Sequence, residues 1–477
     1  MRRNLPKIII SLLIFIIAAL PRLYRINNPV ADWHSWRQAD TAAVARNFIK
    51  GRFNLLYPQS DSLLALNPKQ LPNPQRLFIN EFPLYNAIVA LLYQQFGVHE
   101  IYARLVSVFF ASLGAVFLYW LTFDLFGFKT ALITGLFYAF NPYNVYYGRV
   151  IMPDPAFISL SIMSFYLFLV WLKSPKWLSA IFLSLTFSLA MLVKPYAVFM
   201  LLPFLYWALV TQGKKIFLKS QTYFIALSSL IPFLLWRYHY QLHPEANFDT
   251  NWLFNQTNIR FTGAFFRWLI YDRLNRLIFA TGGFVLLIIG ILNSYLDKTR
   301  GLIFVWFLSV IFYMTIFAMG NVTHDYYQLP IMPVGSILVS LGFWAIINKY
   351  KKPLQRAISV LIALSLFLIS FAFGWYEVRG FFNINHPEIV AAGQAVDKLT
   401  PKDALVIAAY NSDPAFLYQT NRHGWPDGVE IETKIKQGAT HYVSVNYDNV
   451  AQWLEKNCSV VEKTDQYIII DLQACRL

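Results

Sequence analysis

Apolar residues along the chain are gathered into long runs that short polar tracts separate. Most of these runs approach the roughly 20 residues that an α-helix needs to cross the hydrocarbon layer of a membrane. The pattern therefore predicts a polytopic α-helical membrane protein with about eleven transmembrane helices. The expected spans are 8–24, 100–124, 130–148, 155–172, 177–193, 196–211, 221–238, 277–296, 302–318, 329–347 and 357–376.

Composition agrees with a membrane protein, because 57% of the residues are hydrophobic and only 14% are charged. A formal net charge of +15 is also found in proteins that bind nucleic acid. The basic residues, however, fall in short tracts between apolar runs and form no single soluble surface, so we expect no nucleic-acid partner. The positive-inside rule assigns these tracts to the cytoplasm, together with the N-terminus. They are Arg2, Arg3 and Lys7; Lys129; Lys173 and Lys176; Lys214, Lys215 and Lys219; Lys298 and Arg300; and Lys349, Lys351, Lys352 and Arg356.

One apolar stretch, 84–97, does not fit the alternation of spans. Counting it as a span would place the Lys214 and Lys215 tract outside, so we interpret it as a short helix lying at the membrane interface. A re-entrant or fully spanning segment is the alternative. The first apolar run is expected to be a retained span, because no small-residue cleavage site follows it. The segments that then face outward are 25–99, 149–154, 194–195, 239–276, 319–328 and 377–477, and the long external loops among them are 25–99 and 239–276.

The last hundred residues differ in character from the apolar remainder of the chain. Residues 1–377 are expected to form the transmembrane domain, and residues 378–477, the tail domain, a small extracytoplasmic α/β domain. Strand-like runs occur at 404–409, 441–445, 459–462 and 467–472. The chain's two cysteines, Cys458 and Cys475, flank the last predicted hairpin and either pair as a disulfide or remain two buried thiols.

Three polar clusters lie where apolar runs end, on the side expected to face outward. They are 32–40, 149–155 and 324–327. Ionisable groups at a membrane boundary usually serve function. The sequence has no metal-type Cys/His spacing, phosphate-cradling glycine loop or internal repeat, which argues against a nucleotide-driven pump.

Five motifs in this order resemble the membrane glycosyltransferases of the GT-C superfamily, in particular family 39 and the aminoarabinose-transferase-like branch. They are Asp32 to Asp40 with its continuation to Phe48, Glu81 to Tyr85, Arg149 to Pro155, Lys194-Pro195, and His324 to Pro330. The resemblance covers the membrane region but not the tail domain. It implies a GT-C fold and transfer of a sugar from a polyprenyl-phosphate donor to an acceptor glycan, lipid or protein, at the outer side of the plasma membrane.

Such a reaction needs a carboxylate that accepts the proton of the attacking hydroxyl. Asp40 and Asp32 are the candidates, and we favour Asp40 because it precedes the helical segment that contains Arg46. This branch commonly has an adjacent Asp-Glu pair here, which this sequence lacks. Asp154 is a third catalytic candidate, with capping of the following helix as the alternative.

The departing phosphate needs cations or hydrogen-bond donors that hold its charge. The candidates are Arg149, Lys194, His324, Tyr326, Arg260 and Arg267. Snorkelling to lipid headgroups is the alternative role for Arg149. The family's basic residue in the Glu-x-Pro motif is replaced by Phe82, so phosphate binding rests on these other cations.

Further substrate contacts are expected from Glu81, His34, Arg37 and Tyr85, with static pairing to Asp32 or Asp40 as the alternative for Arg37. Hard oxygen ligands could also bind Mg²⁺ or Mn²⁺. The residues for such a site are Asp32, His34, Asp40, Glu81 and Asp154. They form no compact ligand motif, so we expect no obligatory metal.

A transporter or flippase for lipid-linked glycans is the main alternative function. Such a protein is expected to carry charges near the middle of its helices and to repeat in two halves. This chain places its polar residues at the outer ends and shows no repeat. A membrane scaffold that binds a partner through the tail domain is the third reading, and it leaves the placement of Asp40, Asp154 and Lys194 unexplained.

Overall fold

The computed structural model describes residues 5–65, 67–294 and 297–475. Contacts divide the chain into two compact units, each of which is described by itself. Unit 1 comprises Met1–Ile26, Ser107–Arg237 and Thr250–Gly380, and unit 2 comprises Asn27–Val106, Tyr238–Asp249 and Phe381–Leu477. The tail domain thus groups with the first external loop. The expected division at residue 377 stays a prediction.

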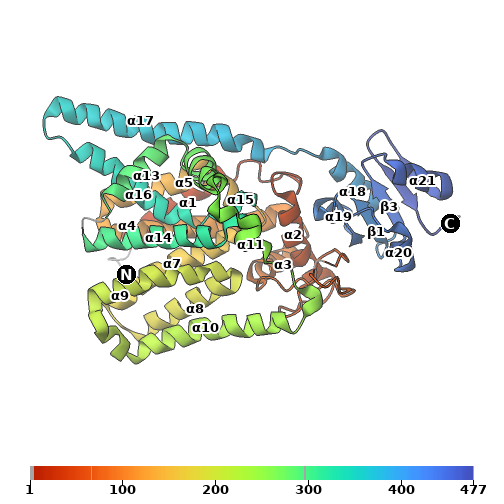
Figure 1. Ribbon diagram of the computed structural model, residues 1–477, viewed down its shortest axis with the longest axis horizontal. Coiled ribbons are helices and arrows are strands. Elements are labelled where there is room, and N and C mark those ends of the chain that lie inside the picture. Colours follow the sequence, from red (N-terminus) through yellow and green to blue (C-terminus); the bar gives the residue numbers. More distant parts are fainter. Residues whose placement is uncertain (1–4, 66, 295–296, 476–477) are drawn as a thin grey trace. The chain divides into compact units, whose positions relative to one another are not determined.

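Unit 1 is built almost entirely of helices (Figure 1). Its longer helices are α1 (Leu5–Arg22), α4 (Glu100–Phe126), α5 (Phe128–Phe140), α7 (Asp154–Lys173), α8 (Trp177–Val193), α9 (Leu201–Gln212), α10 (Ser220–Gln241), η5 (Arg267–Ile278), α13 (Gly282–Leu292), α14 (Lys298–Ile316), α16 (Ile331–Asn348) and α17 (Pro353–Val378). Shorter turns join them: α6 (Pro142–Tyr147), η1 (Pro195–Met200), η2 (Gly213–Leu218), α11 (Trp252–Asn255), η4 (Gln256–Phe261), α12 (Gly263–Phe266), α15 (Ala318–Thr323) and η6 (Asp325–Gln328).

Each expected span overlaps a helix in the described residues, which confirms a polytopic helical membrane protein. Residues 295–296, at the end of the expected span 277–296, lie outside the described residues. Within the described residues, 7 helices are long and apolar enough to cross a membrane. An eighth is added if the pair Gly263–Ile278 and Gly282–Leu292, bent by 117°, counts as one span. The expected spans at 130–148 and 177–193 correspond to the shorter apolar helices α5 and α8. The number of spans by length and composition is therefore lower than the expected eleven.

Small residues allow the helices of unit 1 to pack closely. A Cβ added to Gly290 of α13 would overlap the carbonyl of Leu338 on α16, and one added to Gly342 of α16 would overlap the carbonyl of Leu286 on α13. Helix association in membranes relies on this kind of close backbone approach, because apolar burial gives no driving force between helices in lipid. The glycines of α13 and α16 therefore fix the core of the helical unit.

In unit 2, the first external loop forms α2 (Ser35–Lys50) and α3 (Leu84–Phe96). The two helices pack through Val44 and Phe48 on α2 and Ala87 and Ala90 on α3. The 13 residues of α3 extend about 20 Å, less than the roughly 30 Å of hydrocarbon that a span must cross. Its length therefore suits the short interfacial helix expected at 84–97.

The tail domain contains a five-stranded sheet with the order β2-β1-β3-β5-β4. The strands are β1 (Leu405–Ala409), β2 (His423–Trp425), β3 (His441–Ser444), β4 (Ser459–Lys463) and β5 (Ile468–Asp471). β1 is parallel to β2 and β3, whereas β5 is antiparallel to β3 and β4. This confirms the small α/β domain and its four expected strands. β2 was not expected, because its three residues are too few to show an alternating pattern.

Helices surround this sheet in the tail domain (Figure 1). They are α18 (Pro387–Leu399), α19 (Pro414–Gln419), α20 (Ile431–Lys436) and α21 (Asn449–Asn457), and η3 (Pro244–Ala246) and η7 (Arg379–Phe382) are short turns outside the tail's sheet. Ile407, Tyr442 and Ile470 pack with the residues of α20 and α21 in one buried cluster. Cys458 and Cys475 are joined by a disulfide, so the alternative of two thiols does not apply here.

Candidate functional site

In unit 1, Asp154 and Lys194 form a buried ion pair. Asp154 is the first residue of α7 and Lys194 directly follows the end of α8, so the chain brings them to adjacent helix ends. The Lys194 Nζ lies 3.1 Å from the Asp154 Oδ1. The N-cap position of α7 belongs to Pro153, and the Asp154 carboxylate is engaged with Lys194.

Aromatic rings enclose the ammonium group of Lys194. Its Nζ lies 5.9 Å from the ring centroid of Tyr196 and 5.7 Å from those of Tyr326 and Tyr327. The His324 ring is stacked on both Tyr326 and Tyr327. Cation–π attraction favours a charged ammonium in such surroundings. Four predicted residues, Asp154, Lys194, His324 and Tyr326, therefore gather in one cluster of unit 1.

Asp325, a buried acid outside the predicted set of site residues, lies within the third polar cluster, 324–327. The hydroxyl of Tyr147 donates to the side chain of Asp325, and the hydroxyl of Tyr143 donates to the Asp325 carbonyl over 2.6 Å. Both tyrosines belong to α6 and are fully buried. The sequence shows that Asp325 is an acid next to His324. It does not show its two tyrosine partners, because they are about 180 residues away.

The other predicted phosphate-binding cations contact the backbone. The fully buried Arg149 donates to the carbonyls of Arg25 and Tyr24. Arg260 donates to the carbonyls of Thr315 and Ile316 at the end of α14, over 2.6 Å each. Arg267 is exposed at the start of η5. Phosphate binding by these three arginines stays a prediction.

In unit 2, Asp32 is a buried anchor of the first external loop. Its Oδ1 accepts a hydrogen bond of 2.6 Å from the Gln38 side chain, and its Oδ2 lies 3.6 Å from the Arg104 guanidinium. Both charged side chains are fully buried. Arg104 also donates to the carbonyl of Asn28. Such an arrangement fixes the entry to α2.

Arg37 pairs with Glu81, at 2.6 Å between Nη2 and Oε2, which joins α2 to the segment before α3. The Tyr85 hydroxyl donates to the Ala103 carbonyl over 2.7 Å. His34 takes a left-handed backbone conformation, φ 55°, immediately before α2. Of the four expected substrate contacts, Arg37, Glu81 and Tyr85 thus have protein partners that hold them in place.

Asp40 differs from Asp32 in its electrostatic surroundings. Burial raises the pKa of the Asp40 carboxyl to about 7; Arg37 acts in the opposite direction, whereas Asp413 and Asp61 raise the pKa further. Asp413, at the N-cap of α19 in the tail domain, was not selected from the sequence, and burial raises its pKa as well. A carboxyl group that titrates near neutral pH is suited to accepting and returning a proton.

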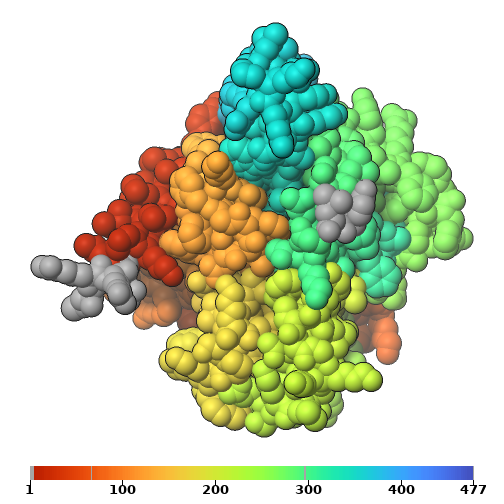
Figure 2. Space-filling model, turned by 90° about the vertical axis from the view of Figure 1, so that its left-hand side faces the viewer, coloured from red at the N-terminus to blue at the C-terminus, as the bar shows by residue number. Residues whose placement is uncertain are grey.

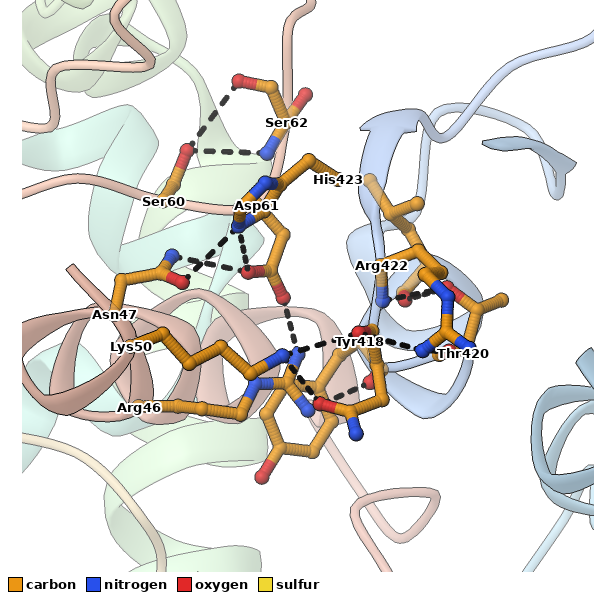
Figure 3. Close-up of polar contacts among 12 residues, drawn as sticks. Arg46, Asn47, Lys50, Ser60, Asp61, Ser62, Tyr418, Thr420, Arg422 and His423 are labelled. Carbon is orange, nitrogen blue, oxygen red and sulfur yellow. Dashed lines mark hydrogen bonds and ion pairs between the residues drawn. The ribbon is translucent and has the colours of Figure 1, made fainter. Parts of the chain in front are cut away.

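Figure 3 shows the network that holds α2 against the tail domain. Arg46 forms a buried ion pair with Asp61 and donates to the Tyr418 carbonyl over 3.1 Å. Its guanidinium lies 4.2 Å from the centroid of the Tyr418 ring. Asn47 donates to Asp61 over 3.0 Å and contacts His423 at 3.2 Å. The tail domain therefore holds α2 at Arg46, six residues after Asp40 on the same helix.

Comparison with known proteins agrees with this architecture. The family model described as dolichyl-phosphate-mannose-protein mannosyltransferase matches residues 80–238. The crystal structures of ArnT from Cupriavidus metallidurans, in the apo state and bound to undecaprenyl phosphate, superpose with TM-scores of 0.66 and 0.63. Each has 14% sequence identity, with coverage of 98% of this chain and 97% of that one. The chain has the GT-C fold.

A second GT-C structure gives the same result over a smaller part of its length. The oligosaccharyltransferase of Archaeoglobus fulgidus matches with a TM-score of 0.59 and 11% identity, covering 91% of this chain and 69% of that chain. No curated protein matches the chain. The family-model match includes Glu81, Tyr85, Arg149, Asp154 and Lys194, whereas Asp40 lies outside it.

Several of the acidic residues considered for a divalent-cation site are paired with cations in the structure. Among the described residues, no group of three or more His, Cys, Asp or Glu side chains could hold a metal ion. Three of the expected ligands instead face cations: Asp32 faces Arg104, Glu81 faces Arg37, and Asp154 faces Lys194.

Proposed function

We propose that the chain is an integral-membrane glycosyltransferase that moves a sugar from a polyprenyl-phosphate donor to an acceptor outside the cytoplasm. The observation that carries this proposal is the fold, which 98% of the chain shares with an ArnT structure bound to undecaprenyl phosphate. The candidate base is Asp40, a half-buried carboxyl on α2 whose pKa burial raises to about 7. At that pKa, a substantial fraction of Asp40 is a carboxylate at neutral pH and is basic enough to accept a hydroxyl proton.

In the proposed reaction, the acceptor oxygen forms a bond to the anomeric carbon of the sugar. The bond between that carbon and the phosphate oxygen breaks, and the lipid phosphate leaves with the bonding electron pair. The acceptor's proton passes to Asp40. Asp32 is assigned a positioning role, because its carboxylate is committed to Arg104 and Gln38.

Lys194 is the residue to which we assign the charge of the lipid phosphate, with Tyr326 and His324 beside it. Asp154 holds the ammonium in place from the other side at 3.1 Å. Two facts support a lipid-linked donor: the fold match to an ArnT structure that contains undecaprenyl phosphate, and the match to a family model for a dolichyl-phosphate-mannose enzyme. The acceptor is a glycan, a lipid or a protein. The N-terminus is assigned to the cytoplasm and the tail domain to the opposite side.

The test uses the full chain in lipid nanodiscs with a panel of polyprenyl-phosphate sugars and acceptor hydroxyls. Release of free polyprenyl phosphate is measured for the wild type, Asp40→Asn and the control Asp465→Asn, which changes an exposed acid of the tail domain. We expect Asp40→Asn to lower turnover by about 10²- to 10⁴-fold and the control to leave it unchanged. Lack of turnover with every donor, or full turnover in Asp40→Asn, would contradict the proposal.

A further inference from the structure

A large basic cavity lies at one end of unit 1, and its lining includes none of the residues assigned to sugar transfer. Its volume is about 800 Å³. Figure 2 looks onto this end, where the beginning of α5 (orange), the beginning of α14 (green) and the beginning of α17 (cyan) come together. The cationic residues in its lining are Lys129, Arg300, Lys349 and Arg356. Three segments that are distant in sequence, around 129, around 300 and 349–356, thus contribute positive charge to one space.

Carboxylates do not balance this charge. Within the part of the chain that the structure describes, only Arg300 has an acidic partner, Asp297, at 3.3 Å, and this pair is partly solvent-exposed. Lys129, Lys349 and Arg356 have no carboxylate oxygen within 4.0 Å among the described residues. All three are exposed to solvent. The cavity therefore carries a surplus of positive charge that an anion could neutralise.

The walls of the cavity are apolar as well as basic. Phe126, Ile289 and Leu341 line it beside the cations. Trp344 donates from Nε1 to the Lys129 carbonyl over 3.1 Å, and its ring lies 5.8 Å from the Lys129 Nζ. Tryptophan at the end of a membrane helix is typical of the headgroup level of a bilayer. A ligand that fits here has an anionic group joined to an apolar one.

We propose that this cavity binds the phosphodiester headgroup of an anionic phospholipid. Phosphate oxygens accept hydrogen bonds from Lys129, Lys349 and Arg356, and the beginning of the acyl chains lies against Trp344 and its apolar neighbours. Basic pockets between transmembrane helices recognise lipid headgroups in this way. The basic tracts of this end are those that the positive-inside rule assigns to the cytoplasm, and the cytoplasmic leaflet is rich in anionic lipid.

The test is native mass spectrometry of the full chain titrated with phosphatidylglycerol or with phosphatidylcholine of the same acyl composition. The variant Lys129→Gln/Lys349→Gln/Arg356→Gln removes three charges from the cavity. The matched control Lys176→Gln/Lys214→Gln/Lys215→Gln removes three exposed charges of other basic tracts. We expect phosphatidylglycerol affinity to fall about tenfold or more in the cavity variant and to stay unchanged in the control. Phosphatidylcholine should bind weakly to all forms.

Two further arms make the outcome decisive. Lys349→Gln alone changes one exposed side chain and does not endanger folding, and it should weaken phosphatidylglycerol binding about threefold or more. Excess inorganic pyrophosphate should leave the bound lipid in place. Equal phosphatidylglycerol affinity in the wild type, the triple variant and Lys349→Gln would overturn the proposal. Displacement of the lipid by pyrophosphate would also overturn it, because the cavity would then be a site for soluble phosphates.

Discussion

Lys194 and Asp154 form an ion pair of 3.1 Å in which both side chains are about 95% removed from solvent. Loss of Lys194 removes a buried cation from beside the Asp154 carboxylate, and breaking a buried ion pair in this way costs about 3–5 kcal/mol. We therefore expect Lys194→Met to lower the unfolding temperature strongly in thermal denaturation of the full chain. The double variant Lys194→Met/Asp154→Leu should recover most of this loss, yet remain inactive in sugar transfer.

The exposed pair of Lys173 and Asp124, at 2.9 Å, serves as the control for this experiment. An exposed pair contributes only about 0–1 kcal/mol, so Lys173→Met should leave the unfolding temperature nearly unchanged. If the effects of Lys194→Met and Asp154→Leu simply add in the double variant, the two side chains are not energetically coupled.

The raised pKa of Asp40 predicts opposite effects of pH on activity and on stability. The proposed base works as a carboxylate, so kcat/KM should rise with pH through about 7. Between pH 3.8, its ordinary value, and about 7, folded Asp40 retains a proton that the unfolded chain has lost. The contribution of Asp40 to stability therefore falls as pH rises through this interval.

Asp40→Asn separates these two effects. The variant should lose transfer activity, but above pH 7 it should unfold at a higher temperature than the wild type, because no charge has to be buried. Below pH 3.8 the two proteins should unfold alike. Thermal unfolding and activity profiles across this pH range provide the measurement, and an Asp40→Asn variant less stable than the wild type above pH 7 would show that the carboxylate is needed for folding.

The ion pair between Arg46 and Asp61 predicts that the tail domain stabilises the helix that contains Asp40. Arg46→Gln removes the buried cation that pairs with Asp61, and breaking a buried ion pair in this way costs about 3–5 kcal/mol. We expect faster hydrogen–deuterium exchange in both 35–50 and 405–425. Arg52→Gln is the control, because it changes an exposed arginine just after the same helix, and it should leave the protection of both segments unchanged. Protection that is lost in α2 alone would mean that the tail domain is held by other contacts.

Local patterns in the sequence were sufficient for the helices and for one cluster of the candidate site. Apolar runs indicated where helices form, and the alternation in the tail domain indicated β1, β3, β4 and β5. Asp154, Lys194, His324 and Tyr326 were selected because each lies at the end of an apolar run, and they lie together in unit 1. These residues could be predicted because polar groups at the ends of membrane helices need a partner.

Partners that are distant in sequence could not be predicted in the same way. Arg149, for example, donates to the carbonyls of Tyr24 and Arg25, which only the folded chain brings near. Asp413 influences Asp40 from more than 370 residues away through the docking of α19 on α2. Neither relationship leaves a periodic or compositional signal, because it depends on tertiary packing.

His423 predicts that the contact between α2 and the tail domain weakens in acid. Burial, followed by the nearby charge of Arg76, lowers its pKa from 6.5 to about 4, so the imidazole is neutral in the folded chain. Between these pH values the unfolded chain binds a proton that folded His423 does not, and stability therefore falls as pH decreases from 6.5 to about 4. His423→Gln should reduce this loss in thermal unfolding of the full chain, because glutamine does not titrate.

His386→Gln, which alters an exposed histidine of the tail domain, should leave the acid dependence intact. If stability is lost in acid to the same extent in His423→Gln, other groups cause the loss. The contact between His423 and Asn47 would then not depend on pH.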